Sequence, residues 1–255
     1  MARVGDAVAD IQAGLLDKVV LSRRLTLTAP QPFVVSRIMA ALTKSHPRCS
    51  VFALATPGGG VFMGASPELL ARLRNGEASC DALAGTAWDD GHGLLSDVKN
   101  AREHRLVVQS IAESLRPLCA RLEVPAAPVV LHLGHLHHLW SSLHGKTKPG
   151  VGLLDLLERL HPTPAVGGYP RQTALDWLAS HGESRHDWYT GAVGWMDAAG
   201  DGEFAVALRC AHIRGNRADL YAGAGIVAGS DARTELAETE AKLAAMLDAI
   251  GGKGA

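Results

Sequence analysis

Two carboxylates and an ammonium group lie at helical spacing near the end of the chain. Glu235, Glu238 and Lys242 are three and four residues apart, so a helix places them along one stripe. Gly223 and Gly225 precede them, and glycine allows positive φ and close approach of a ligand to the backbone. Such a group can hold a hard cation together with an anionic ligand. The alternative is a solvated helix face with an i, i+4 ion pair, which is a common and weak arrangement.

Glu103 is a second candidate because it lies on an apolar stripe. Residues 96–121 are expected to form a helix, and its apolar side carries Val107, four residues after Glu103. A carboxylate that faces a core is costly unless it meets a cation or hydrogen-bond donors. The residue is therefore either part of a site or one half of a buried ion pair with Lys99 or Arg102.

Two further patterns suggest chemistry that their surroundings argue against. Residues 131–143 hold several histidines, but no cysteine or H-E-x-x-H pattern accompanies them, and strand alternation divides them between two faces. Zinc is therefore not expected there. Residues 223–228 fit the dinucleotide fingerprint G-x-G-x-x-A, yet that motif needs a second strand after its helix, and none follows here. The histidines are His132, His135, His137 and His138.

Composition narrows the class of protein. The chain has 255 residues, 47% of them hydrophobic and 20% charged, which is ordinary for a globular protein. The formal net charge is −1, so the chain lacks the excess of basic residues that is typical of proteins that bind nucleic acid or membrane surfaces. No apolar segment reaches the roughly 20 residues of a spanning helix, and the N-terminus lacks the features of a signal peptide. The four cysteines are widely spaced without a C-x-x-C pair, so we expect a cytoplasmic protein.

Hydrophobic periodicity predicts many strands interspersed with helices. Turn-rich segments such as residues 57–60 and 197–202 join neighbouring strands, which favours an α+β protein with antiparallel sheets. We see no internal repeat and no linker, so we expect one domain. Strands are expected over residues 18–27, 51–55, 61–64, 69–74, 78–83, 189–196, 203–213 and 218–221, and helices over residues 6–16, 33–44, 96–121, 152–160, 173–180 and 232–250.

Several stretches taken together resemble the chorismate-utilising enzymes, which include isochorismate, salicylate, anthranilate and aminodeoxychorismate synthases. Each motif alone is modest, but their joint order and spacing are highly specific and cover nearly the whole chain. HPTPAVGG and the lysine of KVVLSR are most similar to the isochorismate synthase branch. The matching stretches are KVVLSR (18–23), GASPELL (64–70), LAGTA (83–87), KNAREHRLV (99–107), HPTPAVGGYP (161–170), GAVGW (191–195), LRCAHI (208–213), AGAGIVAGSD (222–231) and ETEAK (238–242).

The resemblance implies a fold and a set of site residues. The fold has two large, mainly antiparallel sheets packed together with helices outside, and the active site lies between the sheets and uses Mg²⁺. Lys18 matches the lysine that activates water for attack on C2 of chorismate, and Glu68 matches the acid that protonates the departing C4 hydroxyl. Glu103 and Glu238 match metal-binding glutamates, and Glu235 an additional carboxylate near the metal. The positions that match the substrate pocket are Gly85, His138, Ala165, Val166, Tyr189, Leu208, Arg209, Tyr221, Gly223 and Lys242.

The chemistry gives physical reasons for these residue types. Chorismate is a dianion, and the planar fork of Arg209 can grip a carboxylate. A lysine acts as a base only when desolvation or nearby positive charge lowers its pKa from the usual value of about 10.4. Hydroxide is a poor leaving group, so the acid that assists it must be protonated, which requires a raised pKa at Glu68.

The chain departs from the family pattern in three places. Only 17 residues precede Lys18, whereas family members usually carry a longer N-terminal region. We therefore expect a single chorismate-binding domain, residues 1–255, that lacks most of that region. Asn100 stands where an acidic residue is common, and Ser141 replaces a frequent threonine.

The expected activity is the Mg²⁺-dependent isomerisation of chorismate to isochorismate by a monomer. The expected partner is this small molecule, with no nucleic acid and no membrane. Two alternatives stay open: a salicylate synthase, which adds pyruvate elimination at the same site, and an inactive shortened relative that acts as a binding module. The sequence does not choose between siderophore and menaquinone biosynthesis as the destination of the product.

Overall fold

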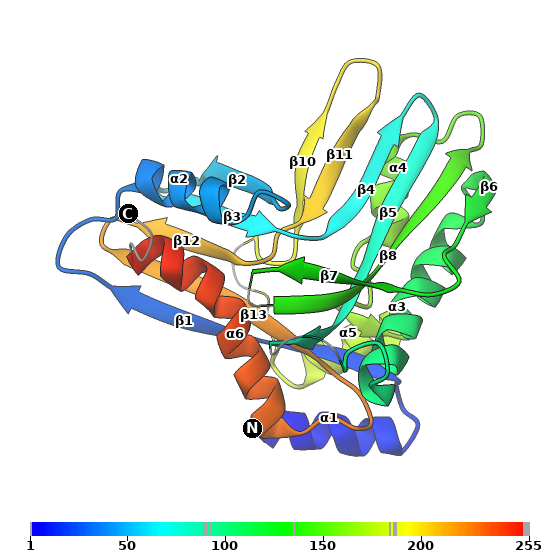
Figure 1. The fold of residues 1–255 in the computed structure, drawn as a ribbon, viewed down its shortest axis with the longest axis horizontal. Coiled ribbons are helices and arrows are strands. Elements are labelled where there is room, and N and C mark those ends of the chain that lie inside the picture. The colour runs from blue at the N-terminus through cyan, green and yellow to red at the C-terminus, as the bar shows by residue number, and fades with distance from the viewer. Residues whose placement is uncertain are drawn as a thin grey trace.

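The computed structural model describes residues 2–88, 91, 93–134, 136–183, 185 and 188–251. Within these residues the chain forms two mainly antiparallel sheets and six helices (Figure 1). The expected α+β class with two sheets and outer helices is confirmed.

The first sheet is built around the long pair β1 and β13. These strands pair in antiparallel register from Val19 opposite Ile226 to Thr28 opposite Arg217. The sheet order is β2-β3-β12-β13-β1-β9. The strands are β1 (Lys18–Thr28), β2 (Ser50–Ala55), β3 (Val61–Ser66), β9 (Gly168–Tyr169), β12 (Cys210–Arg214) and β13 (Arg217–Ile226).

The second sheet is built around β5 and β8, which pair from Glu77 opposite Lys146 to Ala87 opposite His137. Its order is β10-β11-β4-β5-β8-β6, and β7 pairs with the beginning of β8 in a hairpin. The strands are β4 (Leu69–Arg74), β5 (Glu77–Ala87), β6 (Cys119–Glu123), β7 (Val129–Leu133), β8 (Leu136–Thr147), β10 (Ala192–Met196) and β11 (Gly202–Val206).

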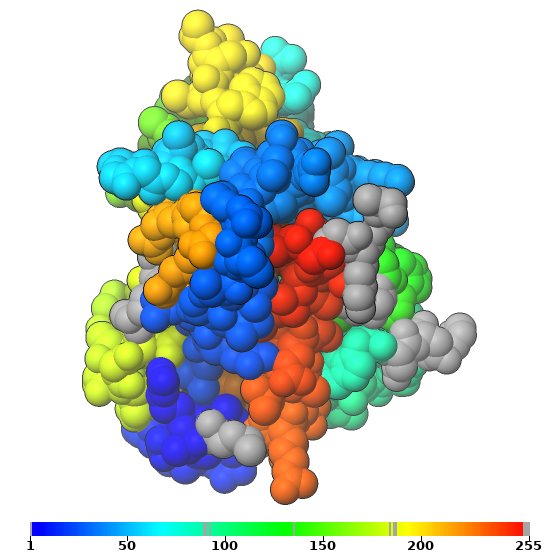
Figure 2. Space-filling view, turned by 90° about the vertical axis from the view of Figure 1, so that its left-hand side faces the viewer, coloured from blue at the N-terminus to red at the C-terminus, as the bar shows by residue number. Residues whose placement is uncertain are grey.

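Helices cover the outer face of each sheet through their apolar stripes. Helices α3 and α4 pack on the second sheet with Ile111 and Leu156 in the contact, whereas α2 and α6 pack on the first sheet with Leu42 and Met246. Figure 2 shows α2 and the end of α6 against each other on this face. The helices are α1 (Ala2–Gln12), α2 (Val35–Ser45), α3 (Val98–Leu115), α4 (Leu153–Leu160), α5 (Arg171–Ser180) and α6 (Ala232–Gly251).

The chain crosses between the two sheets at two short segments that bear on the site. It leaves β3 at Ser66 and enters β4 at Leu69, so Glu68 lies at the first crossing. It leaves β11 at Val206 and enters β12 at Cys210, so Arg209 lies at the second. Arg209 has a φ of 47°, in the left-handed region that is uncommon for residues other than glycine. Both crossings place charged side chains between the sheets.

Several expected boundaries are wrong, and tertiary pairing explains the largest errors. The strand expected over residues 203–213 is divided into β11 and β12 by the second crossing. The strand expected over residues 218–221 continues to Ile226 because β1 pairs with it throughout, so Gly223 and Gly225 lie in a strand and not in a turn. The helix expected over residues 96–121 ends at Leu115, and the first helix begins at Ala2.

Within the described part of the chain, no helix has the length and apolar character needed to cross a membrane.

We expect the core of the first sheet to contribute strongly to stability. Leu220 on β13 is fully buried in this core, so Leu220→Ala should lower the free energy of unfolding by about 2–5 kcal/mol. Leu154 on α4 is 58% exposed, and Leu154→Ala should change it by less than about 0.5 kcal/mol. Urea denaturation of both variants measures the difference. Equal shifts would contradict this account of the core.

Candidate active site

A cavity between the two sheets collects side chains from distant parts of the sequence. The space between its lining atoms is about 660 Å³, part of which is open to solvent. Strands β1 and β13 supply one side, and β5, β8 and the two crossings supply the other. The lining residues are Lys18, Val20, Pro67, Glu68, Leu83, Ala84, Gly85, Thr86, Glu103, His138, Ala165, Val166, Tyr189, Leu208, Arg209, Tyr221, Ala222, Gly223, Gly225 and Lys242.

Lys18 and Glu103 form a buried ion pair at the base of the cavity. Lys18 begins β1 and is fully buried, and its Nζ lies 2.9 Å from Glu103 Oε1. The two atoms meet at ion-pair distance but outside hydrogen-bond geometry. Burial disfavours the charged form of Glu103, but the contact with Lys18, together with the charges of Lys242 and Lys99, outweighs burial and holds the pKa of this carboxyl below its usual value. The expected alternative partners Lys99 and Arg102 are therefore wrong.

The glycines of β13 make room for this arrangement. A Cβ on Gly225 would overlap Glu103 Oε1 and crowd the side chain of Lys18. A Cβ on Gly223 would lie 2.9 Å from the hydroxyl of Tyr189, whose ring stacks on Tyr221 with centroids 5.5 Å apart. Glycine is thus required here for close approach of side chains to the strand.

Helix α6 contributes two more lysine–glutamate contacts. Asp231 caps the helix by accepting hydrogen bonds from the N–H groups of residues 233 and 234. Lys242 Nζ contacts Glu238 at 2.6 Å and donates to the carbonyl of Gly223 at 3.0 Å. Glu235 accepts from Lys99 on α3 at 2.5 Å. The expected stripe is therefore present, and it faces the sheet junction and not solvent.

Glu235 differs from its neighbours in having an unsatisfied oxygen. Its Oε2 is buried and has no hydrogen-bond partner among the described residues. Burial, and then the negative charge of Glu238, raise the pKa of the Glu235 carboxyl, although Lys99 opposes the shift. This carboxylate would gain from an added positive charge.

Glu68 has the opposite electrostatic character to Glu103. It is only 2% exposed, and burial followed by the charge of Asp81 raises its pKa to about 8, although Lys18 and Lys242 oppose the rise. Its Oε1 has no hydrogen-bond partner among the described residues. At neutral pH the Glu68 carboxyl is therefore mainly protonated and can donate a proton into the cavity.

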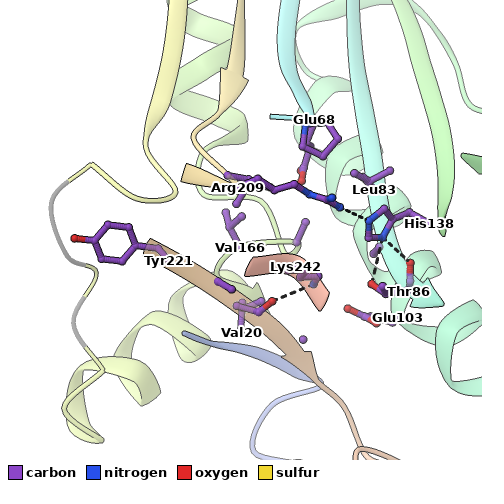
Figure 3. Close-up of a pocket in the computed structure, with 18 of the residues that line it drawn as sticks. Val20, Glu68, Leu83, Thr86, Glu103, His138, Val166, Arg209, Tyr221 and Lys242 are labelled. Carbon is purple, nitrogen blue, oxygen red and sulfur yellow. Dashed lines mark hydrogen bonds between the residues drawn. The ribbon is translucent and has the colours of Figure 1, made fainter. Parts of the chain in front are cut away.

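Arg209 and His138 form the polar wall opposite Lys242 (Figure 3). Arg209 Nη2 lies 2.6 Å from His138 Nε2, and because a guanidinium only donates, Nε2 is the acceptor. His138 Nδ1 then carries the hydrogen and donates to the carbonyl of Gly85 at 3.2 Å. Burial and the nearby Arg209 charge hold the pKa of His138 well below its usual value, so the ring is neutral.

Arg209 itself has no carboxylate partner in the described part of the chain, and burial lowers its pKa to about 10. A buried guanidinium in this state favours an incoming anion. The cavity therefore offers a cation for an anionic ligand from Arg209 on one side and from Lys242 on the other.

The structure brings together nearly all of the residues expected at the site. Every residue expected as catalytic or substrate-binding lines the cavity, and so does Glu103. Glu238 and Glu235 lie behind it, paired with lysines. Sequence reasoning missed several apolar and backbone contributors. The spacing from Lys18 signals Val20, which shares its strand face. Leu83 and Ala222 are signalled only by their place at the start of the family-like stretches LAGTA and AGAGIVAGSD.

The histidine-rich stretch divides between two faces, as strand alternation predicts. His138 faces the cavity, whereas His132 and His137 are a cross-strand pair on β7 and β8 with their Nδ1 atoms 2.7 Å apart. His135 lies outside the described residues. No group of three or more metal-ligating side chains occurs within the described residues.

The cavity between the two sheets thus combines the buried Lys18 and Glu68 with two cations, Arg209 and Lys242, that could receive an anion. A family model described as chorismate binding enzyme matches residues 1–251. The chain belongs to this family.

Individual relatives are similar over nearly the whole chain. The salicylate biosynthesis isochorismate synthase of Pseudomonas aeruginosa is 41% identical over 98% of this chain and 55% of its own. The menaquinone-specific isochorismate synthase of Escherichia coli superposes with a TM-score of 0.88 at 36% identity, covering 97% of this chain and 59% of that one. Anthranilate synthase component I of Streptococcus pneumoniae gives 0.83 at 28% identity, over 95% and 56%. The chain thus spans little more than half the length of these relatives.

Glu68 should make stability depend on pH in a definite direction. Its pKa of about 8 in the folded state lies above the ordinary 4.5, so the folded state binds this proton more tightly than the unfolded state. Between these pH values the unfolded chain ionises first, and the folded state loses stability as pH rises. Glu68→Gln cannot ionise, so its melting temperature should exceed that of the wild type by a margin that grows from pH 5 to pH 9.

The matched control for this measurement is Glu77→Gln, which changes an exposed glutamate on β5. Its difference from the wild type should stay nearly constant over the same range. A margin for Glu68→Gln that shrinks or stays flat as pH rises would contradict the raised pKa.

Proposed function

We propose that this protein is an isochorismate synthase, which interconverts chorismate and isochorismate. The observation that carries the proposal is that Lys18 and Glu68, both buried, open into one cavity, Lys18 from the start of β1 and Glu68 from the crossing between β3 and β4. The names of the relatives support the same reaction. The reaction adds water at C2 and removes the C4 hydroxyl, so it needs a base and an acid at separate places on one ring.

Substrate binding is assigned to the cations of the cavity. Chorismate carries two carboxylates, and the buried Arg209 has a planar donor fork suited to one of them. Lys242 reaches the carbonyl of Gly223 from α6 and adds a second positive charge near the same space. Tyr189 and Leu208 supply apolar wall for the ring.

Proton transfer is assigned to Lys18 and Glu68. In the form that reacts, Lys18 has given up its ammonium proton and is a neutral amine. It takes a proton from the attacking water as the water oxygen bonds to C2. The ring double bonds shift, the C4–O bond breaks, and Glu68 gives its proton to the departing hydroxyl, which leaves as water. Charge and protons balance, because one group gains the proton that the other loses. The pKa of about 8 at Glu68 supports the acid role near neutral pH.

The described residues hold no ready cluster of three metal ligands, and each carboxylate near the junction of α3 and α6 contacts a lysine, so an Mg²⁺ ion here would bind through one or two of them. Glu103 and Glu238 are buried carboxylates, and Glu235 adds the unsatisfied Oε2. Mg²⁺ commonly binds through one or two carboxylates and keeps its waters, so a closed cage of protein ligands is not required. Glu103 and Glu238 would hold the ion and Glu235 would assist. The bound ion would supply positive charge for a carboxylate of the substrate.

Incubation of the purified chain with chorismate and Mg²⁺, followed by chromatography of the products, tests the proposal. Isochorismate alone is expected. Lys18→Ala and Glu68→Gln should each lower kcat by about 10²–10⁴-fold, because each removes one proton-transfer group, while chorismate binding is retained. Two variants are used because Lys18→Ala leaves Glu103 buried without its counter-charge and destabilises the fold.

The products distinguish the alternatives. Salicylate with pyruvate would indicate a salicylate synthase. A folded wild type without turnover would indicate a binding module, and full activity in either variant would overturn the corresponding role.

Metal binding can be measured without turnover. Glu238→Gln should weaken Mg²⁺ binding to the free protein by about tenfold or more in calorimetric titration, because it removes an anionic ligand. Glu240→Gln on the same helix is the control, since its side chain is 63% exposed, and it should leave the affinity unchanged. Equal affinities for the two variants would remove Glu238 from the metal site.

A further inference from the structure

Beyond β9, the outer edge of β1 is completed by a loop carbonyl and by side chains, and not by a strand. β13 pairs with β1 along its length, but β9 covers the other edge only at Lys18 and Val19. Beyond that point the Val20 N–H donates to the carbonyl of Gly167 at 3.0 Å, and the Ser22 N–H donates to Glu183 Oε1 at 2.8 Å. Buried or half-buried backbone groups at a strand edge need such partners.

Glu183 gathers several donors at this edge. Its side chain is only 3% exposed although it lies in a connection after α5. Oε1 accepts from the Ser22 N–H and hydroxyl and from Arg185 Nη1 at 3.2 Å, whereas Oε2 accepts from Arg3 Nη1 at 2.6 Å. The Glu183 carboxylate therefore binds the guanidinium groups of both Arg3 and Arg185, and of these two only Arg185 also contacts residues that line the cavity.

Arg185 connects Glu183 to two residues that line the cavity. Its Nη2 donates to the carbonyls of Val20 and Val166, each at 2.8 Å. Val20 is two residues from Lys18 on the same face of β1, and Val166 belongs to the loop between α4 and α5. Both valines line the cavity, but Arg185 does not. Arg185 therefore ties one wall of the cavity to the other without touching its interior.

We infer that Glu183 and Arg185 are positioning residues, which together hold the loop of residues 161–170 against β1 and fix the separation of Val20 and Val166. Glu183 orients the guanidinium, and the guanidinium joins the two carbonyls. The catalytic part of this inference rests on the proposed function. The structural part does not, because it concerns hydrogen bonds that are present without substrate.

Arg3 provides a matched control. Arg3→Met and Arg185→Met each remove one guanidinium from the same carboxylate, but only the second loses the contacts with Val20 and Val166. Arg185→Met should lower kcat/KM for chorismate by about 10–100-fold, since small displacements in a site are costly. Most of the loss should appear in KM, because the valines are walls and do not transfer protons. Arg3→Met should stay within about twofold.

Arg185→Lys separates charge from geometry. It keeps a cation beside Glu183, but a single ammonium lacks the planar fork that bridges two carbonyls. Its KM should therefore lie between those of the wild type and Arg185→Met. A KM equal to the wild-type value would show that charge alone is sufficient and would overturn the bridging role.

Hydrogen exchange tests the structural part independently of turnover. In the absence of chorismate, Arg185→Met should speed exchange at the amides of Val20 and Gly167 by about tenfold or more, whereas Arg3→Met should leave them near wild type. If the wild type exchanges as expected but has no turnover, the proposed function fails and the positioning role stands. Equal exchange in the two methionine variants would overturn the inference.

Discussion

The buried ion pair of Lys18 and Glu103 is the constraint on which the rest of the site depends. Two full charges removed from water are tolerated only when they face each other closely, and breaking such a pair costs about 3–5 kcal/mol. The pair joins the first residue of β1 to α3 across β13, and so it couples the two sheets. Gly225 lies beneath it because any side chain there would occupy the space of the two charged groups.

The same cavity holds two glutamates with opposite electrostatics, and the difference arises from partners and not from residue type. Glu103 meets Lys18 directly, and its pKa falls. Glu68 meets no lysine at contact distance among the described residues, so burial, followed by the charge of Asp81, raises its pKa to about 8. Two carboxyl groups whose pKa values are shifted in opposite directions are suited to different tasks, one as a fixed anion and the other as a proton donor.

Much of this arrangement could be predicted from the sequence, and the failures have physical causes. The position of Glu103 on an apolar stripe correctly indicated burial, but periodicity cannot name a partner 85 residues away, and Lys18 replaced the expected Lys99. The glycines of β13 indicated close approach correctly, yet their strand was expected to end early, because long-range pairing with β1 overrides local turn propensity. Leu83 and Ala222 begin family-like stretches, but hydrophobic periodicity does not show that they face one cavity, because that depends on the register of two different sheets.

The hydrogen bonds of Glu183 and Arg185 at the edge of β1 show how a site can depend on residues that take no part in its chemistry. A sheet normally continues through backbone pairing, but at Val20 the next strand has ended and a loop approaches. A loop carbonyl and side chains then take over the hydrogen bonds that a strand would make, and Arg185 donates to the carbonyls of both Val20 and Val166. Such residues lie outside any motif built from cavity contacts. They are found by asking which groups bind the backbone N–H and C=O groups at an incomplete sheet edge. In this fold, that incomplete edge begins at Val20, two residues beyond Lys18.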